Sequence, residues 1–351
     1  MRVTDPQQPS NPQRRDPGIE LVESPCALCG ETKAVPCAAG TDFEYDTTDH
    51  EFQFVQCQSC AHQYLKPRPA PSEMDRIYPS NYYSFVGTRN RLVAGLQRLW
   101  ESRKVKLYRT WIGEGPRRIL DVGCGDGRFL ELLRDFGSPE WKLGGLESDP
   151  DAVERCREKG FEAYSERVEE FALKSEEQNQ YDAVIMLQLL EHVENPSRIA
   201  DQVFQLLRAG GLFVIETPHL GGLDYQLFQG RHWGHYHFPR HFHLFSEATL
   251  RDVLKKSGFE IVEHKFLIST SSWIISAHNY LKDRGWPALV WRFFSYQNPI
   301  LLALAVGIDT LRIRLGQTTS NQRVLARRPP VRAETSPVPY GRKDDARATL
   351  A

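Results

Sequence analysis

Apolar and amphipathic segments alternate along the chain between residues 91 and 268. Short apolar runs predict strands at 119–123, 142–147, 161–164, 181–187, 211–216 and 259–268. Apolar residues at helical spacing predict helices at 91–112, 128–136, 150–159, 196–207 and 246–257. Pro196 and Ser246 are residue types that favour the start of a helix. Strands that alternate with amphipathic helices predict an α/β fold whose parallel sheet is covered on both faces.

Residues 286–315 depart from this rhythm. They are strongly apolar, include Arg292, Arg312 and Arg314, and have a longest uncharged stretch, 293–308, that is too short for a membrane span. They predict a helix in a membrane interface or, alternatively, a helical hairpin that packs on the sheet or is buried in a dimer; we favour peripheral membrane contact. A final strand is predicted at 321–327. Residues 1–20 and 329–351 are rich in proline and polar residues and are predicted to be disordered.

Composition limits the class of protein. The chain has 351 residues, which suggests two domains, and a formal net charge of -1. This balance argues against a dedicated nucleic-acid-binding protein, which normally has a basic excess. The first residues contain no apolar core of the kind that a secretory signal needs. We therefore expect a cytoplasmic protein, with 286–315 as its contact to the inner face of the membrane.

Four of the seven cysteines form two matched pairs, Cys26-x-x-Cys29 and Cys57-x-x-Cys60. Two residues between the thiols allow one turn to present both sulfurs to a tetrahedral ion, so the pairs predict a structural zinc module over 21–66. Two unrelated reduced pairs, or one redox pair, are the alternatives. The segment 41–55 is rich in aromatic and β-type residues and predicts a small hairpin. The other cysteines are expected to serve packing: Cys37, Cys124 and Cys156.

A glycine-rich turn follows the first strand of the predicted sheet and contains Asp121, Gly123, Gly125 and Gly127. Glycines let the backbone approach a ligand closely, and the helix that follows offers unpaired N–H groups. The spacing is GxGxG rather than the GxGxxG of dinucleotide sites, and the preceding acid can bind an ammonium group, so the turn favours a small zwitterion. Glu147 closes the next strand, where an acid can bind both hydroxyls of a ribose.

The segments 119–130, 145–150, 181–196 and 207–218 resemble, in this order, motif I, the acidic second-strand end and the fourth- and fifth-strand motifs of the class I S-adenosylmethionine-dependent methyltransferases. The resemblance extends from residue 117 to about residue 270. It implies a Rossmann-like sheet of seven strands with the last strand antiparallel, within a domain at 117–328. It also implies that 269–320 is a helical insertion before the last strand, which departs from the family's minimal pattern. Independently of the resemblance, the prolines at the start of 67–116 and the helical spacing of 91–112 predict a helical connector or lid over 67–116.

The resemblance also implies which residues bind S-adenosyl-L-methionine. Asp121, Gly123, Gly125 and Gly127 would line its methionine and ribose end, and Glu147 would bind the ribose hydroxyls. Two residues at the end of the fourth strand would lie beside the methionine portion: Leu187 and Gln188.

The four-cysteine module, together with the segment 66–69 and the pair Tyr82-Tyr83, is similar to bacterial methyltransferases of sugar and polysaccharide biosynthesis. This similarity implies a sugar, a nucleotide sugar or a glycolipid precursor as the methyl acceptor. A quinone or polyketide-like metabolite is the alternative acceptor. Two rival classes are a zinc-containing adaptor with a non-catalytic domain and an NAD-dependent oxidoreductase, which the GxGxG spacing disfavours.

Methyl transfer to an oxygen or an acidic carbon needs a base, and His192 follows the fourth strand, at the sheet edge where α/β sites lie. A helix-capping pair with Glu191 is the alternative role. Five histidines also lie between residues 232 and 243. This stretch predicts a substrate lid, with His241 as base and Arg240 as the ligand of a phosphate or carboxylate. It could instead form a second metal site or a packed aromatic loop.

Overall fold

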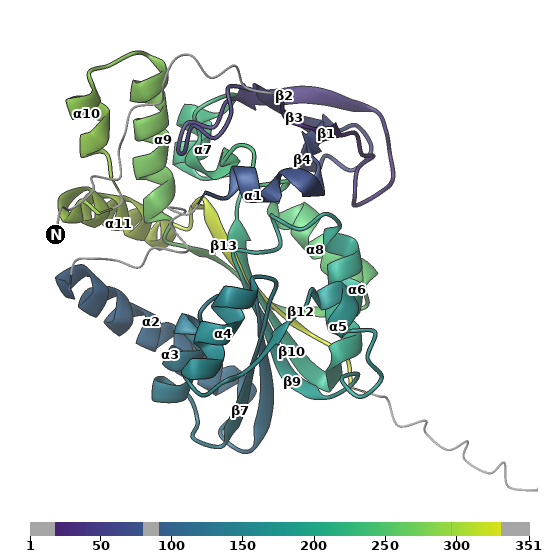
Figure 1. The fold of residues 1–351 in the computed structure, drawn as a ribbon. Helices are drawn as coiled ribbons and strands as arrows, with labels where there is room; N and C mark the ends of the chain where they lie inside the picture. The colour runs from purple at the N-terminus through teal and green to yellow at the C-terminus, as the bar shows by residue number, and fades with distance from the viewer. Residues whose placement is uncertain (1–17, 80–90, 296, 331–351) are drawn as a thin grey trace, which may run out of the picture.

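The protein is described by a computed structural model over residues 18–79, 91–295 and 297–330. Its centre is a sheet of seven strands (Figure 1). In spatial order these are β12 (Glu260–Leu267), β13 (Asn321–Arg327), β10 (Leu207–Pro218), β9 (Tyr181–Leu187), β6 (Arg117–Val122), β7 (Trp141–Glu147) and β8 (Glu162–Ser165). The five strands from β10 to β8 are parallel, whereas β13 runs antiparallel to both β10 and β12. The predicted seven-stranded sheet with an antiparallel last strand is confirmed.

Helices cover both faces of this sheet (Figure 1). One face packs against α2 (Arg91–Ile112), α3 (Arg128–Phe136) and α4 (Pro150–Glu158). The other face packs against α5 (Val168–Phe171), α6 (Pro196–Leu206) and α8 (Glu247–Lys256). The central strand β9 is buried along nearly its whole length, which explains its continuous apolar sequence.

Capping side chains fix the starts of α4, α6 and α8. Asp149 and Asn195 accept hydrogen bonds from backbone N–H groups in the first turns of α4 and α6. Ser246 and Thr249 form a reciprocal capping box at α8, so the predicted helix start at Ser246 is confirmed. Since the capping residues follow strands β7 and β9 closely, they help to direct the loops at the carboxyl edge of the sheet.

The N-terminal segment forms a small antiparallel sheet of β2 (Ala34–Gly40), β3 (Phe52–Cys57) and β4 (Gln63–Leu65), completed by β11 (His243–Leu244). A hairpin is present, but the prediction that it lies within 41–55 is wrong about its first strand. The first strand of the hairpin is Ala34–Gly40, and residues 41–51 form the connecting loop. That strand consists mainly of alanines and Val35 and contains no aromatic residue, so the aromatic-rich stretch 41–55 gave a misleading position for the hairpin.

A second pairing ties the start of the described chain to the connector. Strand β1 (Leu21–Val22) pairs with β5 (Arg68–Pro69), ahead of the short helix α1 (Met74–Ile77) and the 3-10 turn Pro71–Glu73. Glu20, which lies in the stretch predicted to be disordered, accepts a hydrogen bond from Ala70 N at 2.9 Å. The predicted disorder therefore does not reach residues 18–20. Residues 1–17, Tyr82-Tyr83 and 331–351 lie outside the described residues, as do the predictions made for them.

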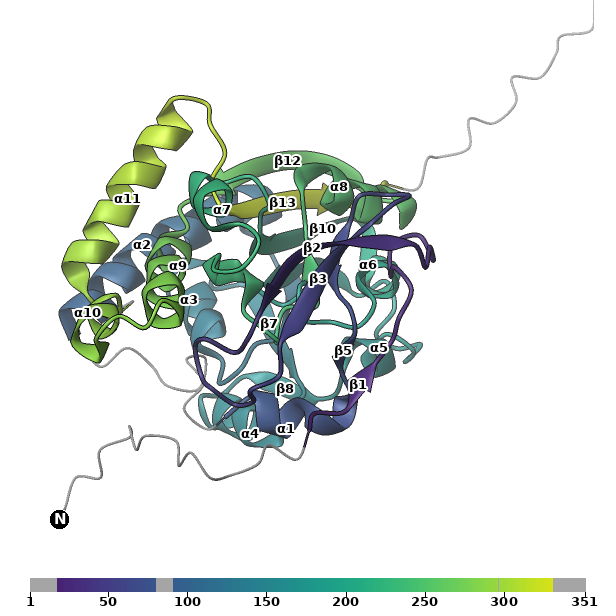
Figure 2. The same cartoon turned by 90° about the horizontal axis from the view of Figure 1, so that it is seen from above.

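The module and the main domain share structure rather than only a linker. Strand β11 comes from the histidine-rich loop, yet it pairs with β4 of the N-terminal module. The module lies over one end of the large sheet, as seen from above (Figure 2). The module at 21–66 and the domain at 117–328, expected to be separate units, therefore share the four-stranded sheet that contains β4 and β11.

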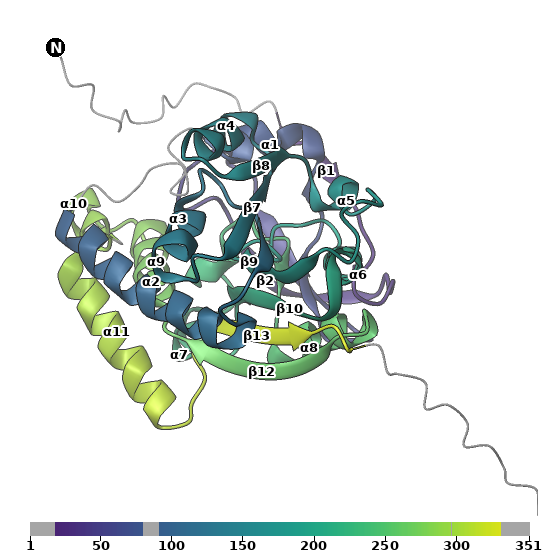
Figure 3. The same ribbon diagram turned by 90° about the horizontal axis from the view of Figure 1, so that it is seen from below.

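The insertion before the last strand is helical, as predicted. It contains α9 (Thr270–Asp283), α10 (Ala288–Phe293) and α11 (Pro299–Arg314), and it follows α7 (Leu223–Phe228) and a 3-10 turn at Gly234–Tyr236. Both α10 and α11 pack against α9. From below, α11 lies at the periphery, on the same side of the molecule as α2 (Figure 3). Among the helices that the structure describes, none combines the length and apolarity needed to cross a bilayer.

Candidate functional site

The glycine-rich turn lies at the carboxyl end of β6, against the neighbouring strand β7. Gly123, Gly125 and Gly127 all have positive φ angles, of 78°, 53° and 81°. Gly123 N donates to Leu146 O at 2.7 Å, which holds the turn to β7. A Cβ atom at Gly123 would lie 2.9 Å from Leu189 Cδ2. Glycine is therefore required here both by the left-handed backbone and by close packing.

Glu147 ends β7 beside this turn. Its Oε2 accepts a hydrogen bond from Gly125 N at 3.1 Å. Its Oε1 accepts from the backbone N–H groups of Ser148 at 2.6 Å and Asp149 at 3.1 Å. The glycine turn and the acid, which are more than twenty residues apart in sequence, thus form one continuous polar cradle.

Asp121 lies beneath the turn and is almost completely buried. Burial raises the pKa of its carboxyl group from 3.8 to about 7, and the nearby Glu147 raises it further while Lys104 acts against the rise. The carboxyl group is therefore divided between its neutral and charged forms near neutral pH. A cation bound in the cradle would favour the charged form.

The segment after β9 brings Leu187 and Gln188 to the same edge. Gln188 has a positive φ of 52°, and its N–H donates to Glu216 O at 2.7 Å. Its side chain donates to Asn321 Oδ1 at 3.1 Å. Because Leu189 packs against Gly123, this segment lies directly beside the glycine turn.

A buried cluster of polar side chains, which the sequence did not indicate, surrounds Glu216 near the end of β10. Lys104 Nζ forms an ion pair with Glu216 Oε2 at 2.8 Å, and the Tyr108 hydroxyl donates to Oε1 at 2.9 Å. Both partners come from α2, one turn apart, so the helix is fastened to the carboxyl edge of the sheet. Their spacing of four residues was available as a signal, but nothing in the sequence indicated which strand they would face.

A second cluster is formed by the two predicted bases, His192 and His241, together with Glu191. The ligand atoms of Glu191, His192 and His241 all lie within 4.8 Å of one another. They meet because the backbone N–H groups of the residues that follow His241 donate to Glu191 O, at 2.8 and 3.0 Å. The site thus joins the loop after β9 to the histidine-rich loop.

The two imidazoles have defined orientations. His192 Nδ1 lies 3.0 Å from Arg240 O, and His241 Nδ1 lies 2.7 Å from His235 O. The Tyr78 hydroxyl also lies 3.0 Å from His192 Nδ1. Because a carbonyl oxygen can only accept, each Nδ1 carries the proton, the Tyr78 hydroxyl oxygen accepts a share of the proton on His192, and each Nε2 is left as an acceptor. Burial lowers the pKa of His192 to about 3 and holds the pKa of His241 well below its usual range. Both rings are therefore neutral near pH 7.

Glu191 completes this group from within the core. The Thr217 hydroxyl donates to its Oε2 at 2.9 Å, whereas the buried Oε1 has no hydrogen-bond partner among the described residues. Burial raises the pKa of this carboxyl group to about 8. The expected alternative, in which Glu191 and His192 cap a helix, does not describe this arrangement, because Asn195 caps the following helix.

Arg240 has a different place from the one expected for a ligand of a substrate anion. Its guanidinium group is completely buried and forms a bidentate pair with Asp42 of the N-terminal module, at 2.9 and 2.8 Å. Both terminal nitrogens already bind this carboxylate. Arg240 therefore positions the loop that carries His241 rather than facing a ligand with a free charge.

The other histidines of this stretch also join separate elements. His235 and His237 do not lie on one extended strand, because Gly234–Tyr236 is a 3-10 turn and His237 has a φ of 41°. The remaining ring contacts are His232 with Asp283, His235 with Ser269, His237 with Glu44 and His243 with His62, at 2.7–3.0 Å. The stretch is therefore a packed wall between the module and the main domain.

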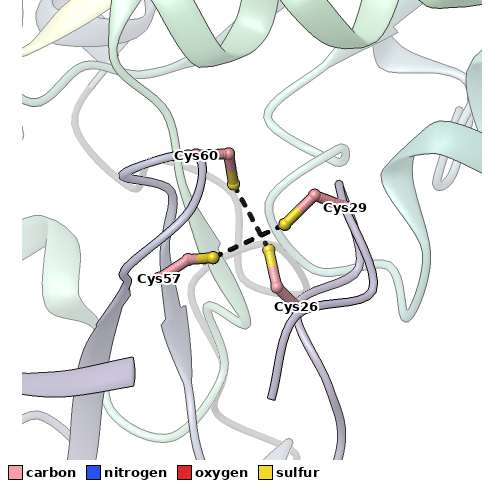
Figure 4. A group of neighbouring side chains, drawn as sticks. All are labelled: Cys26, Cys29, Cys57 and Cys60. Carbon is pink, nitrogen blue, oxygen red and sulfur yellow. Dashed lines mark hydrogen bonds between the residues drawn. The ribbon is translucent and has the colours of Figure 1, made fainter. Parts of the chain in front are cut away.

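The four paired cysteines converge from two turns of the module (Figure 4). Cys26 Sγ lies 3.6 Å from Cys60 Sγ, and Cys29 Sγ lies 3.5 Å from Cys57 Sγ. Four thiolates about 2.3 Å from a tetrahedral zinc ion would be roughly 3.8 Å apart. The observed spacing thus matches what such an ion requires, and all four sulfurs lie within 4.8 Å of one another.

Comparison with known proteins points to one family. The sequence model of the methyltransferase domain family matches residues 87–264, slightly more than half of the chain. The mitochondrial ubiquinone biosynthesis O-methyltransferase of Dictyostelium discoideum is 27% identical over 143 residues, which cover 35% of this chain and 44% of that protein. A probable S-adenosylmethionine-dependent methyltransferase of Mycolicibacterium smegmatis is 25% identical over 181 residues, 50% of this chain and 65% of that protein.

A solved structure, a SAM-dependent methyltransferase from Archaeoglobus fulgidus, is 21% identical and covers 66% of this chain and 94% of that one, with a TM-score of 0.43. The chain spans less than two thirds of the length of the two curated relatives.

Proposed function

The chain belongs to the methyltransferase domain family, and from this premise we propose that it transfers the methyl group of S-adenosylmethionine to a small-molecule acceptor. One observation carries the proposal. The hydrogen bond from Gly125 N to Glu147 Oε2 joins a left-handed glycine turn to the acid at the end of the adjacent strand. A backbone that a ligand can approach and a carboxylate that can accept two hydroxyls therefore lie side by side.

The residues present fit this cofactor. A Cβ atom at Gly125 would meet no other atom within 4 Å, so the turn borders open space. Glu147 can exchange its backbone donors for ribose hydroxyls, and the Asp121 carboxyl group can face the ammonium group of the cofactor. Leu187 and Gln188 would flank the methionine portion. When bound, S-adenosylmethionine supplies an activated methyl group and a sulfide leaving group.

The protein's part in the reaction is to hold the acceptor in line with the methyl group and to remove its proton. Alignment of the two reactants can contribute several kcal/mol. His192 and His241 each present an unprotonated Nε2 at the edge of the sheet, and we assign one of them as the general base. Arg240 acts as a positioning residue, because its carbonyl oxygen orients His192.

For the acceptor, we propose a sugar, a nucleotide sugar or a glycolipid precursor. The support is the resemblance of the four-cysteine module to methyltransferases of sugar pathways. A quinone or polyketide-like metabolite is the second candidate, and the names of the ubiquinone biosynthesis relatives favour it. An adaptor that binds the cofactor without turnover is the remaining alternative.

We also propose that Cys26, Cys29, Cys57 and Cys60 hold a structural zinc ion. The support is the spacing of their sulfurs, which suits a tetrahedral ion. Because four thiolates complete the coordination, no position is left for a substrate. The ion would stabilise the module sheet and would take no part in methyl transfer.

Titration calorimetry and a turnover assay with labelled S-adenosylmethionine test the proposal. We expect Glu147→Ala to weaken cofactor binding by roughly tenfold or more, whereas Glu158→Ala, on the exposed surface of α4, leaves it unchanged. His192→Gln should reduce kcat while cofactor affinity persists. Methyl transfer to nucleotide sugars but not to quinols supports the first acceptor class, and the opposite result supports the second. No binding of the cofactor by folded protein would overturn the proposal.

A further inference from the structure

The outer surface of α10 and α11 is apolar to an unusual extent. Seven large side chains in or next to these helices are at least half exposed, with exposed fractions between 51% and 86%: Trp286, Leu289, Phe293, Ile300, Leu304, Leu311 and Leu315. We call this surface the α10–α11 face. Proteins that stay alone in water seldom expose a contiguous apolar patch of this kind without a partner for it.

The four most exposed apolar residues in or next to α11 form one stripe. Ile300, Leu304, Leu311 and Leu315 are separated by four, seven and four residues. At about 100° per residue, these four positions fall within an arc of about 60°. The stripe therefore presents a single flat face to the outside, at the edge of the molecule (Figures 1 and 2).

The opposite side of α11 is already fixed to the protein. Ala305 and Asp309 are buried. The Asp309 carboxylate accepts hydrogen bonds from Ser269 N at 2.6 Å and Trp273 Nε1 at 2.9 Å, both at or in α9. The exposed stripe is therefore not a face that awaits packing on its own sheet. This rules out, for the stripe itself, the sequence-based alternative of a hairpin packed on the sheet.

The exposed charges within this segment have one sign. Between residues 284 and 316 the sequence contains four arginines and a single acid, Asp309, whose side chain is buried. Arg284, Arg292 and Arg314 are exposed. An arginine rim complements an anionic surface. A second copy related by two-fold symmetry would place the same arginines near one another with no exposed acid of the segment to pair with them.

We propose that the α10–α11 face rests on the surface of a membrane that contains anionic lipids. The sixteen-residue helix α11 is about 24 Å long and would lie in the plane of the interface, with its stripe in the acyl boundary and the arginines at the phosphates. Trp286 and Phe293 are aromatic side chains of the kind that favour this depth. The inference does not depend on the proposed methyl transfer.

Flotation of the full-length protein with vesicles tests it. One set of vesicles contains phosphatidylcholine alone, and the other adds one third phosphatidylglycerol. We expect wild-type protein to float with the anionic vesicles and to be released by high salt. The triple variant Ile300→Ser, Leu304→Ser and Leu311→Ser should lose binding by roughly tenfold or more. Arg292→Gln combined with Arg314→Gln should reduce the preference for anionic lipid.

The matched control is Leu173→Ser combined with Leu227→Ser, since these leucines are 70% and 64% exposed elsewhere on the surface. It should float like wild type. Thermal unfolding of each variant reports on folding, and calorimetry with S-adenosylmethionine reports separately on the proposed function. Wild-type protein that does not float, or a triple variant that floats as well as the control, would overturn the proposal. A concentration-dependent dimer that the triple variant abolishes, without flotation, would assign the face to a second copy instead.

Discussion

Replacement of Asp121 by asparagine should make the protein more stable while it weakens cofactor binding. The carboxyl group is almost completely buried, and its pKa is raised from 3.8 to about 7 by burial and by Glu147. The fold therefore favours the neutral form, and the folded state binds more protons than the unfolded state between these two values. The free energy of unfolding should accordingly fall as the pH rises through this window and level off above pH 7.

The size of the effect follows from the shift. At about 1.4 kcal/mol per pH unit, the raised pKa of Asp121 lowers the free energy of unfolding by roughly 2 kcal/mol at pH 5.5 and by roughly 4 kcal/mol at pH 8.5, relative to an acidic pH at which the group is neutral in both states. Asp121→Asn removes this cost. The stability advantage of the variant should therefore grow by about 2 kcal/mol between the two pH values, however well the amide itself fits. In the same variant, the affinity for S-adenosylmethionine at pH 8.5 should fall by roughly tenfold or more, because the charge opposite its ammonium group is lost.

Urea denaturation of the ligand-free protein at pH 5.5 and pH 8.5 measures the first effect, and titration calorimetry measures the second. The control is Asp126→Asn, which removes a half-exposed carboxylate from the same turn. It should show no comparable growth of the stability difference with pH. If Asp121→Asn and Asp126→Asn behave alike, or if the advantage of Asp121→Asn is the same at both pH values, the account of Asp121 is refuted.

Three further predictions concern the backbone, the metal and the buried ion pair. Gly127→Ala would put a methyl group 2.8 Å from the buried thiol of Cys156 at a residue with a φ of 81°. It should destabilise the protein by about 1–3 kcal/mol more than Gly160→Ala, since Gly160 has a similar φ but borders open space. Equal urea midpoints for the two variants would contradict this prediction. Metal analysis should find one zinc per chain in wild type and in Cys37→Ser, and none in Cys57→Ser; zinc retained in that variant would remove the assignment. Arg240→Met leaves a buried carboxylate unpaired and should cost about 3–5 kcal/mol in thermal or urea unfolding, and a loss below 1 kcal/mol would contradict a buried pair.

The main sheet was predictable because its elements obey local rules. The apolar run of Tyr181–Leu187 and the capping residue Ser246 each indicate their element without knowledge of the rest of the chain. The cradle of Gly125 and Glu147 was predictable for the same reason, since a turn between a strand and a helix and an acid at the next strand end have fixed places in such a fold.

The contacts of the histidine-rich loop were not predictable in this way. Arg240 pairs with Asp42, nearly two hundred residues earlier, and no local pattern indicates that partner. His243 was grouped with its sequence neighbours, whereas its strand completes the sheet of the N-terminal module. The density of histidines in this stretch suggested a catalytic or metal-binding site, whereas most of the rings join distant elements through hydrogen bonds.

The short strand β11 gives the N-terminal module a part in the architecture of the proposed methyl-transfer centre. If residues 18–66 were cut away, β11 would lose the edge it pairs with, and the guanidinium group of Arg240 would be left in the core without its carboxylate. The loop that carries His241 would then lose both its strand pairing with β4 and its ion pair with Asp42. We therefore expect oxidation of the paired cysteines, or loss of the proposed zinc ion, to loosen the loop that carries His241. A fragment trimmed to residues 87–264 should aggregate rather than show the proposed methyl transfer.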